Sequence, residues 1–292
     1  MNAHRPKVSI ITPSFNQGSF IRATIESVLA QTYANIEYIL IDGGSTDDTM
    51  AVVNEYRDRI DVIIHERDRG QSDAINKGFR LATGDLVGWI NSDDLLYPDC
   101  VERIVALYQA HSDGAIFYGA HSDWIDRDGQ LTGRRYLPIP NRTYLLNQCA
   151  DIIQQGSFYA TQYVRAVGYL DETIHYCMDL DLWLKLLTKG PIYCDNGPAV
   201  AAFRRWEATK TSTGGSHFLS DIRQTLRRHG ASLFAPTVIN TQYGTLRESL
   251  RLTPFFRLLK GLRPLVNKRH AYRPLSVYPP YGRSTDSDAE SA

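Results

Sequence analysis

The sequence predicts an α/β fold, in which a mostly parallel, Rossmann-like central sheet is flanked by helices, and two observations lead to this prediction. Short apolar runs rich in Val and Ile each end in a polar or glycine-containing turn. Segments with apolar residues at helical spacing follow these runs over residues 7 to 110. Strands that alternate with helices in this way form parallel, doubly wound sheets.

Four strands are expected in this first half: Val8 to Thr12, Ile36 to Ile41, Val62 to His65 and Leu86 to Ile90. Three helices are expected between them: Phe20 to Gln31, Thr49 to Tyr56 and Asp73 to Ala82. Pro13 is expected to stop the first strand, because proline cannot donate a hydrogen bond to a sheet.

Beyond residue 110 the order is mixed. We expect a strand over Ala115 to Tyr118, a turn at Asp126 to Gly129 and a Pro-containing stretch from Leu137 to Pro140. A helix is expected to follow over Tyr176 to Leu187, because its apolar residues share one face. We expect one domain over residues 1–215, with a nucleotide-binding half at about 7–110 and an acceptor half at about 111–215. A basic, amphipathic helical extension over 216–275 and a disordered tail over 276–292 are expected to follow.

Composition and charge exclude several functions. The 32 Lys and Arg residues balance 32 Asp and Glu residues, so no net charge favours nucleic acid as a partner. The four widely spaced cysteines form no Cys-x-x-Cys pair, which argues against a zinc or redox site. No charged-then-apolar leader and no run of 18 apolar residues occurs, so we expect a cytoplasmic protein. The segment Leu246 to Arg269 places basic residues between Leu and Phe, which fits either peripheral contact with the inner face of the cell membrane or a helix covering the core.

Polar residues follow the fourth expected strand, where Asn91, Ser92, Asp93 and Asp94 stand in a row. The carboxyl ends of parallel strands are where open α/β sheets bind ligands. Carboxylates without nearby Cys or His suit Mn²⁺ or Mg²⁺, whose coordination is usually completed by substrate phosphates. The sequence therefore predicts a metal site at Asp93 and Asp94 and a diphosphate substrate, with a simple polar turn as the alternative.

Eight short motifs occur in a fixed order along the chain. They are Thr12-Pro-Ser-Phe-Asn16, Ser27-Val-Leu-Ala-Gln-Thr32, Asp42-Gly-Gly-Ser-Thr-Asp47, Ala74-x-Asn-x-Gly78, Gly84-Asp85, Asn91-Ser-Asp-Asp94, Gly168-Tyr-Leu-Asp171 and Asp179-Leu-Asp-Leu-Trp183. In this order they resemble the family 2 glycosyltransferases, inverting enzymes of the GT-A fold. The resemblance implies transfer of a sugar from a UDP-, GDP- or dTDP-linked donor to a hydroxyl of a glycan or lipid-linked acceptor, in the synthesis of cell-surface polysaccharide or glycolipid.

The resemblance also implies roles for individual residues. Asp179 matches the catalytic base, with Asp181 in reserve, and Asp93 matches the metal-binding carboxylate. The residues expected to bind the donor are Thr12, Pro13, Phe15, Asp42, Asp73, Lys77, Asn91, Ser92, Arg204 and Arg205. Structural alternatives remain open, because aspartates that begin helices and strand-ending residues such as Pro13 are common without any ligand.

The segment Phe203 to Ser212 resembles the mobile segment that closes over the donor diphosphate. Arg204, Arg205 and Lys210 are its expected cations, and Gly214 and Gly215 its hinges. Exposed basic residues without a ligand are the alternative interpretation.

Three positions depart from the family pattern. Asn91 replaces a carboxylate, Ile75 stands where many members have Arg, and Met178 replaces Glu. These departures motivate a second hypothesis, a non-catalytic homologue that binds nucleotide sugars or glycans. A nucleotidyltransferase is the third, although no Gly-rich basic loop follows the first expected strand.

Overall fold

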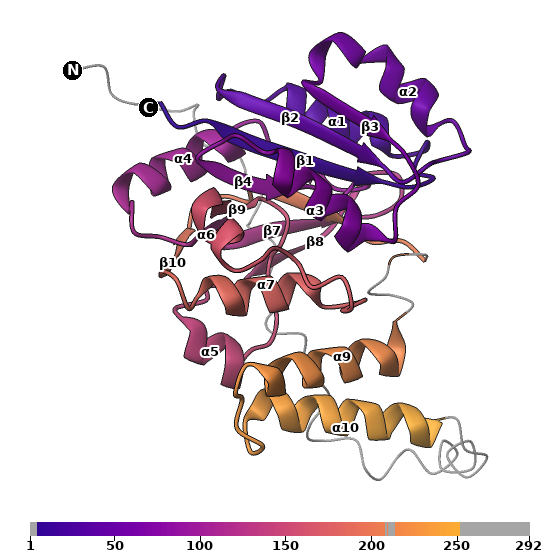
Figure 1. Cartoon of the computed structure of the whole chain (residues 1–292). Coiled ribbons are helices and arrows are strands. Elements are labelled where there is room, and N and C mark those ends of the chain that lie inside the picture. Colours follow the sequence, from indigo (N-terminus) through magenta and orange to yellow (C-terminus); the bar gives the residue numbers. More distant parts are fainter. Residues whose placement is uncertain (1–4, 208, 210–213, 252–292) are drawn as a thin grey trace, which may run out of the picture.

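The computed structural model describes residues 5–207, 209 and 214–251. It contains a seven-stranded sheet and a four-stranded sheet with helices around them (Figure 1). The larger sheet has the order β10-β6-β9-β4-β1-β2-β3, and only β9 runs antiparallel to its neighbours. The predicted mostly parallel sheet flanked by helices is confirmed.

The larger sheet consists of β1 (Val8–Ser14), β2 (Ile36–Asp42), β3 (Val62–His65), β4 (Leu86–Trp89), β6 (Ile116–Gly119), β9 (Ser157–Ala160) and β10 (Ile192–Asp195). The smaller sheet, in the order β5-β11-β7-β8, consists of β5 (Leu95–Leu96), β7 (His121–Ile125), β8 (Leu131–Tyr136) and β11 (Ala201–Arg204). The helices are α1 (Ile21–Leu29), α2 (Thr49–Glu55), α3 (Gln71–Leu81), α4 (Cys100–Ala110), α5 (Arg142–Asn147), α6 (Thr161–Ala166), α7 (Met178–Leu186), α9 (Gly215–Arg228) and α10 (Pro236–Arg251), with a short 3-10 helix at Arg57–Arg59.

Strand β1 is longer than predicted, since it continues through Pro13 to Ser14. Pro13 pairs with Ile41 of β2, whereas β4 accompanies β1 only as far as Ile11. At Pro13 the strand therefore has a neighbour on one side only, and proline is tolerated in such an edge position.

Helix α3 lies against β1, and the Ala74-x-Asn-x-Gly78 motif explains this position. A Cβ atom on Gly78 would come within 2.6 Å of the Ile11 side chain, so the close approach requires glycine. Asn76 is buried, accepts a hydrogen bond from Leu170 N at 3.0 Å and donates one to Leu170 O at 3.1 Å. The motif thus holds α3 between β1 and the turn after α6.

Residues beyond 110 complete the same sheet. Strand β9 lies antiparallel between β4 and β6, so it joins the two expected halves through backbone hydrogen bonds. The expected strand at Ala115 to Tyr118 appears as β6, and the expected turn at Asp126 to Gly129 separates β7 from β8. The strand β9 was not predicted, because its sequence, Ser-Phe-Tyr-Ala, contains none of the Val and Ile residues that marked the other strands.

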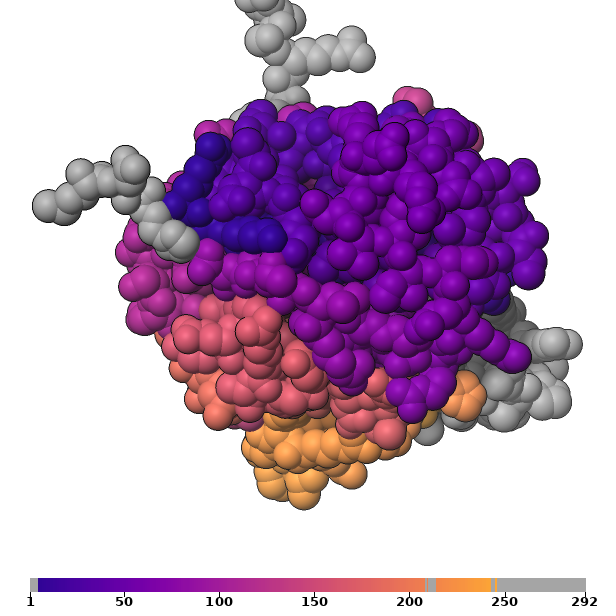
Figure 2. Space-filling model, turned by 45° about the horizontal axis from the view of Figure 1, so that its top comes forward, coloured from indigo at the N-terminus to yellow at the C-terminus, as the bar shows by residue number. Residues whose placement is uncertain are grey.

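The C-terminal helices pack on elements of the second half of the chain. Helix α9 contacts α7, and α10 packs against α9 and α5. Figure 2 shows the orange C-terminal helices at the end of the molecule away from the indigo first strand. The expected boundary at residue 215 coincides with the start of α9. Of the expected basic segment 246–269, only residues up to Arg251 are described, and the expected tail 276–292 lies outside the described residues.

Within the described ranges, no helix combines the length and apolar character needed to cross a bilayer.

Replacing Asn76 with Ala is expected to lower the free energy of unfolding by about 2 kcal/mol, because the buried N–H and C=O of Leu170 lose their partner. Urea unfolding measures this change. The matched control is Asn54→Ala, on the exposed face of α2, which should leave stability unchanged or slightly raised. Equal stability of the Asn76 variant and wild type would contradict this role of Asn76.

Acid unfolding is expected to depend on Glu37, which accepts hydrogen bonds from Lys7, Ser9 and Thr83 at the amino ends of β1 and β2. Burial alone would raise the pKa of Glu37, but these hydrogen bonds outweigh it and lower the pKa to about 2. The stabilisation is therefore complete above the ordinary glutamate pKa and is lost as pH falls toward 2, and by linkage it amounts to about 3 kcal/mol.

Glu37→Gln should accordingly lose stability at pH 7 and show a flatter pH dependence between about pH 5 and 2. Urea unfolding across this range, with the exposed Glu207→Gln as control, measures both effects. A Glu37→Gln curve parallel to that of wild type would refute the assignment.

Candidate active site

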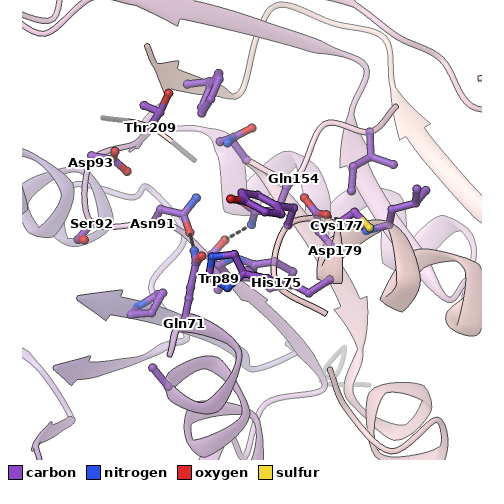
Figure 3. Close-up of a pocket in the computed structure, with 18 of the residues that line it drawn as sticks. Gln71, Trp89, Asn91, Ser92, Asp93, Gln154, His175, Cys177, Asp179 and Thr209 are labelled. Atoms are coloured by element: carbon purple, nitrogen blue, oxygen red, sulfur yellow. Dashed lines mark hydrogen bonds between the residues drawn. The ribbon is translucent and has the colours of Figure 1, made fainter. Parts of the chain in front are cut away.

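A cavity of ≈ 680 Å³ opens at the carboxyl ends of β1, β2 and β4. One wall comes from the loops after these strands, and the opposite wall from residues 150–155, residues 175–180 and α9. Figure 3 shows Asp93 and Asp179 at the two sides, with Asn91 and Gln71 between them. The cavity therefore lies where open α/β sheets commonly bind ligands.

The donor-side wall contains several of the residues predicted from sequence. Six expected site residues line the cavity, namely Pro13, Phe15, Asn91, Ser92, Asp93 and Asp179. Phe15 is 58% exposed, so a large aromatic face is available to a flat ligand such as a base. The sequence thus located both walls of the cavity.

Asp93 presents its carboxylate to the cavity and accepts one hydrogen bond there, from Trp206 Nε1 at 3.1 Å. Burial raises the pKa of Asp93, and the hydrogen bond from Trp206 offsets part of this effect. A carboxylate that is largely removed from water is strongly stabilised by a cation placed beside it.

Asp94 has a different environment from its neighbour and is not on the cavity wall. It is fully buried, and its oxygens accept hydrogen bonds from Arg204 N at 2.8 Å, Gln155 Nε2 at 3.0 Å and Asn91 Nδ2 at 3.1 Å. Burial and the adjacent Asp93 raise the pKa of Asp94. These donors already occupy the oxygens of Asp94, so the structure places Asp93 on the cavity wall and Asp94 behind it.

Asn91 fits this arrangement better than a carboxylate would. Its amide oxygen accepts a hydrogen bond from Gln71 Nε2 at 2.8 Å (Figure 3). Its amide nitrogen donates to Asp94. An aspartate here would place a third acceptor-only group beside two carboxylates. The departure from the family pattern thus supplies a donor that the buried Asp94 needs.

Asp179 lies in the first turn of α7 and lines the cavity. Asp181 lies two residues further along the helix, which turns its side chain to nearly the opposite side. Its carboxylate is 5% exposed and binds His229 Nε2 at 2.8 Å and Lys185 Nζ at 3.0 Å. Burial would raise the pKa of Asp181, but these partners lower it. The geometry leaves Asp181 outside the cavity, so it does not serve there as a reserve base.

Two expected donor residues lie behind the wall. Thr12 is buried, with its hydroxyl 3.1 Å from that of Tyr38. Asp42 is fully buried and accepts hydrogen bonds from Ser45 N at 2.8 Å and His65 Nδ1 at 2.6 Å. Asp42 therefore shapes the turn through which the backbone of Gly43 reaches the cavity.

Asp73 and Lys77 are also not on the wall. Asp73 accepts a hydrogen bond from Arg69 N at 3.0 Å, and contact with the Arg69 guanidinium lowers its pKa. Lys77 Nζ lies 2.8 Å from Glu66. Helix α3 begins at Gln71, so Asp73 lies in its first turn and is not its N-cap. Both side chains hold the loop before α3.

The two expected cations after β11 are likewise directed elsewhere. Arg204 is 4% exposed, and its guanidinium donates to the carbonyl oxygens of Asp93, Asp126 and Arg127 at 2.8–2.9 Å. The Arg205 guanidinium lies 4.7 Å from the ring centre of Trp124. Arg204 thus supports the backbone of Asp93 from behind. Lys210 lies outside the described residues.

Several cavity residues were not found from the sequence. Gln154 Nε2 donates to Trp89 O at 2.7 Å (Figure 3). Gln155 Nε2 donates to Asp94. The signal that could have found them is a pair of glutamines set between apolar residues. Further additions include Arg67, Asp68, Trp124, Arg135, His175, Tyr176, Trp206 and Phe218.

The oxygen ligands on the cavity wall fit a divalent cation that arrives together with a diphosphate. Among residues 5–207, 209 and 214–251, no cluster of three or more His, Cys, Asp or Glu side chains is arranged to hold a metal alone. Mg²⁺ is usually bound through one or two carboxylates plus substrate phosphates, and Asp93 supplies one such carboxylate.

Comparison with known proteins agrees with this geometry. The sequence model described as "Glycosyl transferase family 2" matches residues 9–168. An uncharacterized glycosyltransferase of Rickettsia typhi is 30% identical over 224 residues, which cover 73% of this chain and 68% of that protein. A chondroitin synthase of Escherichia coli is 33% identical over 189 residues, covering 64% of this chain and 27% of that protein. The chain thus spans only part of the length of these relatives.

Two solved structures share the fold. S. aureus TarS 1-349 in complex with UDP-GlcNAc superimposes with a TM-score of 0.61 at 15% identity, covering 89% of this chain and 76% of that one. The mannosyltransferase PcManGT from Pyrobaculum calidifontis, in complex with GDP-Man and Mn²⁺, gives a TM-score of 0.57 at 17% identity, covering 88% and 79%. At these identities the similarity concerns the fold alone.

Replacing Asp94 with Asn is expected to destabilise the protein by about 3 kcal/mol, because one amide oxygen cannot satisfy three donors in a buried site. Thermal and urea unfolding measure the loss. Asp58→Asn, on the exposed 3-10 helix, is the matched control and should be neutral. If both variants unfold with wild-type stability, Asp94 is not the structural centre described above.

Proposed function

The chain belongs to glycosyl transferase family 2, and we propose that it transfers a sugar with inversion from a nucleoside diphosphate sugar to an acceptor hydroxyl. The observation that carries the proposal is one cavity with Asp93 at one side and Asp179 at the other (Figure 3). Solved proteins of the same fold bind UDP-GlcNAc or GDP-Man, which supports a UDP-, GDP- or dTDP-linked donor.

Asp179 is the proposed general base. An inverting transfer requires one carboxylate that takes the proton of the acceptor hydroxyl as its oxygen attacks the anomeric carbon. Asp179 lies across the cavity from the donor wall, at the start of α7.

Asp93 is the proposed holder of Mn²⁺ or Mg²⁺. When bound with the donor, such an ion supplies positive charge against the leaving diphosphate. Arg204 and Trp206 fix Asp93 from behind, through its backbone carbonyl and its carboxylate. The presence of Mn²⁺ in the PcManGT complex supports this assignment.

The donor wall is proposed to receive the nucleoside at Pro13, Phe15 and Gly43, with Arg67 nearby for phosphate. Thr12, Asp42, Asp73 and Lys77 support this wall from behind, and we propose that they act through it without contacting the donor.

The acceptor wall favours a carbohydrate. Tyr176 and Phe218 line it, Trp124 and Phe203 line the cavity from the smaller sheet, and sugars commonly pack their C–H faces on such aromatic rings. A glycan or lipid-linked glycan is the acceptor that we propose, in polysaccharide or glycolipid assembly at the cytoplasmic side of a membrane. The similarity to a chondroitin synthase supports polysaccharide synthesis.

The assay that tests the proposal incubates the protein with UDP-, GDP- and dTDP-sugars, Mn²⁺ or Mg²⁺ and a panel of glycan acceptors. Free nucleoside diphosphate together with an elongated acceptor of inverted anomeric configuration is the expected result. Pyrophosphate release would instead identify a nucleotidyltransferase, and binding without turnover a non-catalytic homologue.

Asp179→Asn is expected to reduce transfer about 10²- to 10⁴-fold, because the amide cannot accept the hydroxyl proton, while donor affinity stays near that of wild type. Initial rates and donor titration by thermal shift separate these quantities. The control is the exposed Asp58→Asn. Wild-type turnover in the Asp179 variant would show that another group is the base.

Asp93→Ala is expected to abolish the metal-stimulated part of the activity, because the cation loses its protein carboxylate. Rates measured against Mn²⁺ concentration, beside Asp58→Ala, give the comparison. A variant stimulated by Mn²⁺ as strongly as wild type would place the cation elsewhere.

A further inference from the structure

Three contacts join α9 to the segment that carries Asp179. They are the hydrogen bond from Tyr176 N to Asp221 Oδ2 (3.2 Å), the contact between Cys177 Sγ and Thr225 Oγ1 (3.3 Å), and the hydrogen bond from His229 Nε2 to Asp181 Oδ1 (2.8 Å). Two of the contacts precede Asp179 in the chain and one follows it. The segment around the carboxylate is therefore held on both sides.

The three residues of α9 and its C-cap lie four positions apart, at Asp221, Thr225 and His229. Residues at this spacing share one face of a helix and advance about 6 Å per step. Their partners advance in the same direction, from Tyr176 to Asp181. The helix and the segment are thus matched along their length.

The middle contact, between Cys177 and Thr225, is buried, and the two flanking contacts are partly buried. Thr225 is 1% exposed, Cys177 3% and Asp181 5%. A helix that only covers a core would present apolar residues at such positions, since buried polar groups are costly unless every one is paired. Paired polar groups, by contrast, keep their hydrogen bonds in only one register between α9 and the segment from Tyr176 to Asp181.

Helix α9 also takes part in the cavity itself. Phe218 and Ile222, on an adjoining stripe of the same helix, line the cavity beside Asp179. At the other end of α9, the Arg142 guanidinium binds His229 O at 3.1 Å and Leu184 O at 3.1 Å, which joins the ends of α9 and α7. The C-terminal end of α9 is therefore tied to α7.

We propose that α9 is a positioning element of the catalytic site, and that Asp221, Thr225 and His229 hold the start of α7 so that Asp179 faces the donor. This inference rests on the proposed role of Asp179 as the base. A small displacement of a catalytic group lowers turnover strongly. The donor wall on β1 and β4 takes no part in the contacts between α9 and the Asp179 segment, so its geometry should not change. Loss of the contacts made by Asp221, Thr225 and His229 is thus expected to lower kcat and to leave the donor KM unchanged.

The first experiment compares removal with conservative replacement. Asp221→Ala, Thr225→Val and His229→Leu are each expected to lower kcat about 10-fold or more, with the donor KM unchanged. Asp221→Asn keeps an acceptor oxygen and His229→Gln keeps an N–H donor, so both should retain most of the turnover. Arg227→Ala, on the opposite, exposed face of α9, is the matched control.

Unfolding of each variant is measured alongside, and rates are expressed per folded protein. If Thr225→Val and the other removals lower only stability, with wild-type kcat per folded protein, α9 has a purely structural role and the inference is overturned. A parallel rise of the donor KM would also overturn it.

The second experiment is a double-mutant cycle with Asp179→Asn. If α9 acts through Asp179, Asp221→Ala should add little to the loss caused by Asp179→Asn, whereas independent effects would multiply. Multiplied effects overturn the inference while the base assignment stands. Full activity of Asp179→Asn alone would instead overturn the proposed function, so the two failures are distinguishable.

Discussion

The buried carboxylate of Asp94 is the constraint on which the cavity depends. It receives a backbone N–H from β11 in the smaller sheet, an amide from Asn91 after β4 in the larger sheet, and an amide from Gln155 before β9. The backbone carbonyl oxygen of Asp94 also accepts a hydrogen bond from the hydroxyl of Thr24 in α1. Polar oxygens buried without water must keep all of their hydrogen-bond partners, so these elements meet in one arrangement. The position of Asp93 is set by the hydrogen bonds of its neighbour, Asp94.

Many of the motif residues that identify the family support the site without reaching it. Gln31 joins α1 to the start of α4, through Tyr97 O and Val101 N. Asn76 and Gly78 place α3, and Asp42 shapes the turn that presents Gly43. A recurrent polar residue can therefore reflect a geometric requirement of the fold as readily as contact with a ligand.

The two sides of the cavity are built differently. The donor side follows from the ends of β1, β2 and β4, whose spacing is set by sheet hydrogen bonds. The acceptor side depends on α7, which takes its position from packing and from the polar row on α9. Helix α9 thus contributes to the cavity that the first half of the chain begins.

The sequence by itself determined the alternation of strands and helices, the family, and the placement of Asp93 and Asp179 on one cavity. Those features depend on local periodicity and on residues that directly end a strand or begin a helix. Only the tertiary structure decided which neighbouring carboxylate faces the cavity, why Asp181 and Arg204 point elsewhere, and how β9 and α9 complete the site. Asp94 meets Gln155 and Arg204 across 61 and 110 residues of sequence, and pairings over such separations leave no local pattern, because folding alone brings the partners together.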